Sequence, residues 1–274
     1  MSHTCHLRHS KPLWSFICLF VAIPAVAHDL YLMPKTFRVK ARTSIQIAFH
    51  NGDDFPESQA AARIERLLEP QVISQQGSAS LKNLRVDHTV VLAEASITHP
   101  GNSIISVHTK PNGIELDPES FEKYLRHEGL SHVLKWRKKN SESSQAGRER
   151  YSKYVKSIVQ ADHSSDFYRH AAGFPIEIFP EANPYSVKVH GTLPVQVLFR
   201  GKPAEDLQVE MSWLSPDGKA ETKIAGRTDA QGRLTIPIHS AGVWKLHTVL
   251  MDRCQDPAAA DWESFWSSLT FEIQ

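Results

Sequence analysis

Histidine is the residue type in this sequence that is best suited to chemistry. The chain of 274 residues has 15 histidines, and imidazole is a good ligand for zinc, copper, nickel and iron. An isolated histidine is more often a surface residue or a hydrogen-bonded core residue, so position must decide which ones are ligand candidates. Twelve lie beyond residue 27: His28, His50, His88, His99, His108, His127, His132, His163, His170, His190, His239 and His247.

The first 27 residues have the pattern of a secretory signal peptide. Arg8 and Lys11 form a positive n-region, the stretch from Leu13 to Ile23 is an apolar h-region, and Ala25-Val26-Ala27 is an A-x-A cleavage site. An uncleaved anchor helix is the alternative, but the apolar stretch is shorter than the roughly 20 residues that span a bilayer. We therefore predict cleavage between Ala27 and His28, and a mature protein that is periplasmic or secreted and not membrane-spanning.

Cleavage makes His28 the amino terminus, which gives one residue two metal-binding nitrogens. The α-amine and the ring Nδ1 can close a chelate ring on one ion. Their ordinary pKa values of about 7.7 to 8.0 and about 6.5 let both lose a proton near neutral pH. Asp29 could add a carboxylate or hold the imidazole ring by a hydrogen bond.

Further imidazoles from neighbouring strands are expected to complete such a site. His247 follows Trp244-Lys245-Leu246 in a predicted C-terminal strand, and His108 lies in a predicted strand of the first half. His50 is the third candidate, because it ends a strand beside the loop 51–54. His127 and His132 are five residues apart and do not share a helix face well, so they are not predicted as a pair.

Other chemistry is weakly represented. We find no G-x-S-x-G, H-E-x-x-H, C-x-x-C, P-loop or G-x-G-x-x-G motif. Cys5 and Cys18 leave with the signal peptide, so Cys254 remains alone and no internal disulfide is expected. The formal charge of +1 gives no reason to expect nucleic acid as a partner. We therefore predict that the protein is not an enzyme; an oxidative copper enzyme built on the terminal histidine is a distant alternative.

Strand patterns dominate the first part of the mature chain. Residues 44–49 alternate with period two, and residues 89–93 and 104–108 follow the same pattern. His99-Pro100-Gly101-Asn102 is turn chemistry between the last two. These signals predict an N-terminal β domain over residues 28–115.

The period changes to that of a helix between about 117 and 160. Asp117-Pro118 resembles an N-cap followed by proline at the first helical position. Apolar residues from Phe121 to Trp136 fall near one face, and after a polar break the pattern restarts over residues 148–159. We predict a helical segment, of about two helices, over residues 116–172.

Strands return towards the C-terminus. Residues 193–199, 207–213, 234–236 and 241–246 have strand patterns, and Ser215-Pro216-Asp217-Gly218 indicates a hairpin. Short strands with frequent turns favour an antiparallel sandwich over residues 173–274. The predicted fold is mainly β, with two antiparallel immunoglobulin-like β-sandwich domains and a helical insertion between them.

Several segments together resemble a known bacterial family. The order of the segments resembles domain-of-unknown-function family 4198 over nearly the whole mature chain: HDLYLMP, FEKYLRHEGLSHVLKWR, GRERYSKYVKSIVQ, IEIFPEANPYSV, VLFRGKPAEDLQVEMSW, TDAQGRLTIPIHSAGVWKLHTVLM and DWESFWSSLTFEI. The resemblance implies an exported protein and a link to periplasmic components of nickel and cobalt uptake systems. The family pattern also has a histidine followed by an acidic residue at His28-Asp29, and a histidine at His247. The C-terminal half resembles the carboxypeptidase-regulatory type of immunoglobulin-like sandwich, commonly a non-catalytic module.

These observations lead to two hypotheses from different classes. The first is an exported periplasmic protein that binds or delivers nickel, cobalt or copper through its terminal histidine, with a metal-uptake membrane system as a possible partner. Its candidate ligands are His28, His247, His108, His50 and Asp29. The alternative is a non-catalytic β-sandwich module of the cell envelope that binds protein or glycan without metal.

Overall fold

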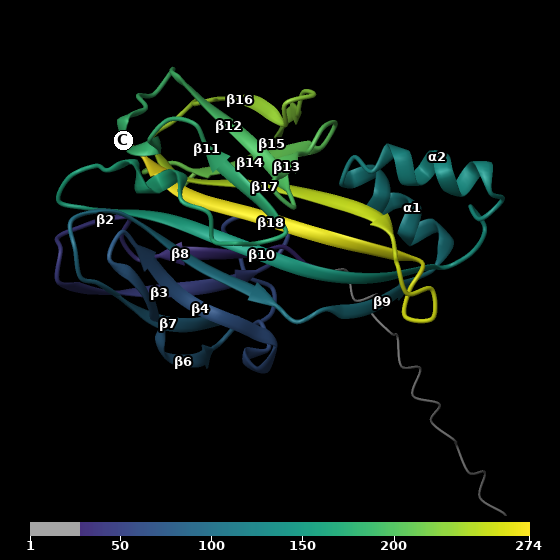
Figure 1. The fold of residues 1–274 in the computed structure, drawn as a ribbon, viewed down its shortest axis with the longest axis horizontal. Helices are drawn as coiled ribbons and strands as arrows, with labels where there is room; N and C mark the ends of the chain where they lie inside the picture. Colours follow the sequence, from purple (N-terminus) through teal and green to yellow (C-terminus); the bar gives the residue numbers. More distant parts are fainter. Residues whose placement is uncertain (1–27) are drawn as a thin grey trace, which may run out of the picture.

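A ten-stranded sheet forms the centre of the structure, a computed structural model that describes residues 28–274 (Figure 1). The predicted signal peptide, residues 1–27, lies outside the described residues. Eight strands of the sheet follow one another in the order β15 (Ala220–Arg227), β14 (Gln208–Leu214), β17 (Gly242–Arg253), β18 (Trp262–Ile273), β10 (Gly147–Ala161), β8 (Gly101–Thr109), β4 (Leu67–Ser74) and β5 (Gly77–Ser80). The short strands β2 (Arg38–Val39) and β9 (Asn112–Leu116) also pair with β10. Neighbouring strands are antiparallel, except that β10 runs parallel to β18 and to β2.

Two four-stranded sheets cover the central sheet. The first has the order β1 (Leu30–Pro34), β3 (Thr43–Asn51), β7 (Val90–Ile97) and β6 (Lys82–Asp87). The second contains β11 (Ile176–Pro180), β12 (Thr192–Phe199), β13 (Lys202–Pro203) and β16 (Arg233–Pro237).

The long strand β10 shows that these two sheets lie on opposite faces. Its residues Val155 and Val159 pack into the core of the first sheet, together with Ile47 of β3. The alternate residue Ile158 packs into the core of the second sheet, together with Ile178 of β11. Because successive side chains of a strand point to opposite faces, β10 has a covering layer on each side.

Two helices occupy one end of the long strands β10, β17 and β18 (Figure 1). They are α1 (Pro118–His127) and α2 (Ser131–Lys139), and three short 3-10 turns lie elsewhere: η1 (Ile64–Arg66), η2 (Asp166–Arg169) and η3 (Pro184–Ser186). The Asp117 side chain accepts a hydrogen bond from the backbone N–H of Ser120, which confirms the predicted N-cap. Gly129, with φ of 67°, separates the helices. Across residues 28–274, no helix has both the length and the apolar character that crossing a bilayer requires.

The prediction of a mainly β protein is confirmed, and the predicted strands are present in β3, β7, β8, β12, β14, β16 and β17. The division into two separate sandwiches is not confirmed. The central sheet takes β4, β5 and β8 from the predicted N-terminal domain and β14, β15, β17 and β18 from the predicted C-terminal domain. Both halves of the chain therefore share one sheet.

The helical prediction is confirmed for α1 and α2 but is wrong for residues 148–159, which belong to β10. Tyr151, Tyr154, Val155 and Ile158 are spaced as on a helix face. The physical reason for the error is that β10 is buried on both faces over most of its length, so its apolar residues do not alternate.

Candidate functional site

Strand β17 carries two charged residues into the interior, which is the most unusual feature of its sequence. Lys245 and His247 alternate with the core residues Trp244 and Leu246, and both are buried. The alternation directs both charged side chains to the same face of the central sheet. Asp29 and the start of β1 (Leu30–Pro34) cover this face.

Asp29 lies between these two cations. Its Oδ2 is 2.5 Å from Nζ of Lys245, and its Oδ1 is 2.8 Å from Nδ1 of His247. Burial alone would raise the pKa of Asp29, but the charges of His247 and Lys245 outweigh it and hold the pKa well below its usual range. Asp29 is therefore a buried carboxylate that stays ionised because two cations neutralise it.

Two further carboxylates complete what we call the buried ionic cluster: Asp29, Lys245, His247, Glu128 and Glu210. Oε2 of Glu128, the residue that follows α1, is 3.3 Å from Nε2 of His247, and Oε1 of Glu210 in β14 is 3.7 Å from Nζ of Lys245. Burial lowers the pKa of His247, but Asp29 and Glu128 more than compensate and raise it to about 10. His247 is therefore an imidazolium at neutral pH.

The neighbouring His28 lies nearer to solvent. Its Nδ1 is 2.9 Å from Oδ2 of Asp53, and the side chains of the two residues are 31% and 44% exposed. The backbone N–H of Asp29 donates to Oδ1 of the same carboxylate, at 3.3 Å. Lys153 of β10 donates from Nζ to the backbone carbonyl of His28. His28 is thus held on both sides, by Asp53 and by Lys153.

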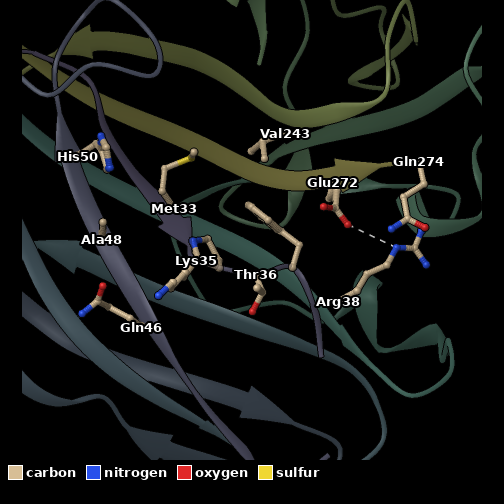
Figure 2. Close-up of a pocket in the computed structure, with 12 residues that line it drawn as sticks. Met33, Lys35, Thr36, Arg38, Gln46, Ala48, His50, Val243, Glu272 and Gln274 are labelled. Atoms are coloured by element: carbon tan, nitrogen blue, oxygen red, sulfur yellow. Dashed lines mark ion pairs between the residues drawn. The ribbon is translucent and has the colours of Figure 1, made fainter. Parts of the chain in front are cut away.

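His50 lies in β3, which pairs with β1, but its ring points elsewhere. It stacks on Tyr31 of β1, with ring centroids 5.2 Å apart. It lines one end of an open pocket of about 620 Å³ between β1, β3 and the ends of β17 and β18, where Arg38 and Glu272 form an ion pair at 3.4 Å (Figure 2). Burial lowers the pKa of His50, and within residues 28–274 its Nδ1 has no hydrogen-bond partner.

His108 lies on the opposite face of the central sheet from the buried ionic cluster. Its ring stacks on Tyr154 at 6.1 Å and packs edge-on against Phe174 at 5.4 Å. Lys153 points to the face of the sheet where it contacts His28. Its neighbour Tyr154 points to the opposite face, because successive side chains of a strand alternate. The sheet therefore separates His108 from His28, and the two cannot share one metal ion.

The five predicted ligands thus fall into three places. Asp29 and His247 are in direct contact, with His28 next to Asp29 in the chain, whereas His50 and His108 point into other environments. Both ring nitrogens of His247 face carboxylates, and an imidazolium has no free lone pair for a metal. In this arrangement Asp29 and His247 are engaged with each other and with Lys245 and Glu128. Residues 28–274 contain no group of three or more His, Cys, Asp or Glu side chains placed to hold a metal ion.

The donors that remain beside His28 are its own ring and the Asp53 carboxylate. A nitrogen and an oxygen that each lie about 2.0 to 2.2 Å from a metal, at a right angle, are roughly 2.9 Å apart. The distance between His28 Nδ1 and Asp53 Oδ2 has this value, and it is also that of an ordinary hydrogen bond.

Sequence reasoning did not single out most of the residues around His28. Asp53 appeared only as part of the loop 51–54, and Lys245 only as a neighbour of His247. Glu128, Glu210 and Lys153 were not considered. A usable signal was present in β17 and β10, where single charged residues interrupt apolar strands.

Comparison with known proteins places the chain in a family without assigning it an activity. Residues 25–252 match the model of the family described as "Domain of unknown function (DUF4198)", and the chain belongs to this family. A search of curated proteins gave no match. One similar solved structure is the Yersinia pseudotuberculosis adhesin InvE, with 9% identity and a TM-score of 0.24 over 89% of this chain and 58% of that one. The chain thus spans less than two thirds of the adhesin's length.

Proposed function

We propose that this DUF4198 protein is exported and binds a transition metal, nickel, cobalt or copper, at its mature amino terminus. The observation that carries the proposal is the position of His28. Its ring lies 2.9 Å from the Asp53 carboxylate, at the start of a strand that the buried Asp29 anchors. Cleavage after Ala27 would add the α-amine to this donor set.

The buried ionic cluster has a supporting role in this proposal. A terminal residue is normally among the least ordered in a chain. Here Asp29 is tied to Lys245 and His247, and Lys153 holds the carbonyl of His28. An anchored terminus loses less conformational entropy when it chelates an ion, which favours binding. His247, predicted as a ligand, therefore enters the proposal as part of the anchor.

Delivery to a metal-uptake membrane system would follow from a terminal site. A metal held by one partly exposed residue and one loop carboxylate can be passed to a partner without unfolding of the protein. The resemblance to periplasmic components of nickel and cobalt uptake systems supports this step.

The deciding experiment compares two amino termini. One form is purified after export with His28 as its first residue and without a polyhistidine tag; the other has a single glycine before His28. After treatment with a chelator, both are titrated with Ni²⁺ and Cu²⁺ in a calorimeter. We expect the glycine-extended form to bind at least tenfold more weakly, because its His28 nitrogen is then an amide.

Two variants identify the remaining ligands. Asp53→Asn should weaken binding, because an amide is a poorer ligand than a carboxylate, whereas His99→Gln at an exposed loop should leave it unchanged. Equal affinities of the native and extended termini would refute the terminal site. They would favour the alternative of a non-catalytic cell-envelope module that binds protein or glycan.

A further inference from the structure

A pocket of about 250 Å³ opens beside His28, and three cationic side chains line it. They are Arg63, Arg66 and Lys153, and no aspartate or glutamate is among the lining residues. The pocket lies between η1 and β10, on the side of the terminus where Lys153 contacts the His28 carbonyl.

Lys153 differs from the other buried lysines of residues 28–274. Lys156 has a carboxylate of Glu177 at 2.7 Å, and Lys245 has that of Asp29 at 2.5 Å. Lys153 is also buried, with 6% of its surface exposed, but its Nζ has no carboxylate within ion-pair distance among residues 28–274. It donates to the His28 carbonyl and to Oδ1 of Asn51, the latter at 3.3 Å, and lies over the rings of Tyr151 and Trp266 at 5.5 and 5.7 Å. A buried charge is costly unless it is paired, so its third donor site calls for an anion.

The two arginines point to the same conclusion. Arg66 lies over the ring of Tyr151, 5.5 Å from its centroid, and donates to the Lys110 carbonyl at 2.7 Å. Neither Arg66 nor Arg63 forms an ion pair with any residue in the described part of the chain. A guanidinium with free donors in a pocket is suited to a carboxylate or a phosphate.

The nearest acids do not neutralise the pocket. Asp29 is engaged by Lys245 and His247, and Asp53 by the ring of His28. Burial raises the pKa of Glu149, which also lies near Lys153, to about 7. These three acids influence the charge of Lys153 only by electrostatic interaction at a distance, without direct contact with its Nζ. The cations that line the pocket therefore keep a net positive potential.

The rest of the lining indicates what kind of anion fits. Leu30, Ala61, Ala62 and Leu67 supply apolar surface between the charged groups. A bare inorganic anion would leave this surface unused, whereas a short carbon skeleton would cover it. We propose that the pocket binds a small organic acid with two or three carboxylates, which Lys153 and Arg66 hold together with Arg63. This site goes beyond the proposed metal site and does not depend on it.

The test is calorimetric titration of the metal-free protein with succinate and tricarballylate. We expect binding of at least one acid, weakened roughly tenfold or more by Arg66→Gln, because a hydrogen bond to a charged group is lost. Arg200→Gln is the matched control. Arg200 also lies over an aromatic ring, that of Phe199 at 4.9 Å, but away from the pocket.

Two results would overturn the proposal. One is the absence of binding by the wild-type protein to both acids at millimolar concentration. The other is inorganic phosphate binding as tightly as the organic acids, since the apolar lining would then contribute nothing. Arg63→Gln, at an exposed position, gives a second loss-of-charge variant that is expected to fold normally. Neither result depends on whether the protein binds metal, so the two proposals fail independently.

Discussion

Replacement of Asp29 by asparagine removes the carboxylate that holds the buried ionic cluster together. The asparagine side chain has nearly the same shape as that of aspartate, so the change isolates charge from packing. Lys245 and His247 would be left side by side in the interior with Glu128 and Glu210 as their only acids within contact distance among the described residues. We expect Asp29→Asn to destabilise the protein strongly.

The magnitude follows from the structure in two ways. A pKa of about 10 for His247, against an ordinary 6.5, corresponds to roughly 5 kcal/mol of stabilisation of its charged form, shared between Asp29 and Glu128. Removal of one partner from a buried ion pair typically costs about 3 to 5 kcal/mol. Both values place the loss in free energy of unfolding at about 3 kcal/mol or more.

Urea unfolding at pH 6, followed by tryptophan fluorescence, measures this loss. The midpoint should fall while the slope with denaturant stays constant, which indicates an unchanged native fold. Asp206→Asn is the control. Asp206 pairs with Arg227 at the surface, where its side chain is 67% exposed, so its replacement should cost less than about 1 kcal/mol.

The effect should also depend on pH with a defined sign. The raised pKa of His247 means that its contribution is complete below pH 6.5 and is lost as the pH rises towards 10. The lowered pKa of Asp29 means that its contribution is complete above about pH 4 and declines in stronger acid. The difference between wild type and Asp29→Asn should therefore be largest between about pH 4 and 6.5 and smaller at pH 9.5. If Asp29→Asn is no more destabilising than Asp206→Asn at pH 6, the reasoning is refuted.

Two other predictions test the helical end and the buried acid near it. Gly147→Ala should lower the free energy of unfolding of the protein by about 1 to 3 kcal/mol, measured by thermal or urea unfolding, because the added Cβ would lie 2.2 Å from the ring of Phe121. Gly113→Ala is the control: the nearest atom to its Cβ would be 4.0 Å away, so this change should have little effect. Burial raises the pKa of Glu149 to about 7, so the stability it confers is complete below its ordinary pKa and is lost as the pH rises through 7. Glu149→Gln should therefore be more stable than wild type at pH 8, by roughly 2 kcal/mol, and lose this advantage at pH 5; a constant difference across this range would contradict the assignment.

Local signals in the sequence were sufficient for much of the secondary structure. Alternation with period two predicted β3 and β8, and Asp117-Pro118 predicted the start of α1. These features depend on residues that are close in the sequence. A strand with one covered face has alternating apolar and polar residues, and a helix begins where a side chain accepts a hydrogen bond from its first N–H groups. The same reasoning failed for β10, where layers on both faces remove the alternation.

The residues of the site could be identified only in part. His28 and Asp29 stood out because a predicted cleavage site and residue type can be read from the sequence, and His247 stood out as a histidine of a predicted C-terminal strand at a position where the family pattern also has histidine. Their contacts are long-range: Asp29 and Lys245 are 216 residues apart, and Lys153 and His28 are 125 residues apart. Strand order brings them together, and no local pattern encodes which strands become neighbours.

The tertiary structure also decided the chemical state of these residues. His247 is a potential ligand by type, but two buried carboxylates make it a cation. His108 has the same side chain, yet the central sheet separates it from His28. Lys153 keeps an unpaired charge because no carboxylate of residues 28–274 packs directly against its Nζ. Residue type sets what a side chain can do, whereas burial and neighbouring charge, which depend on the whole fold, determine which of these states is stable.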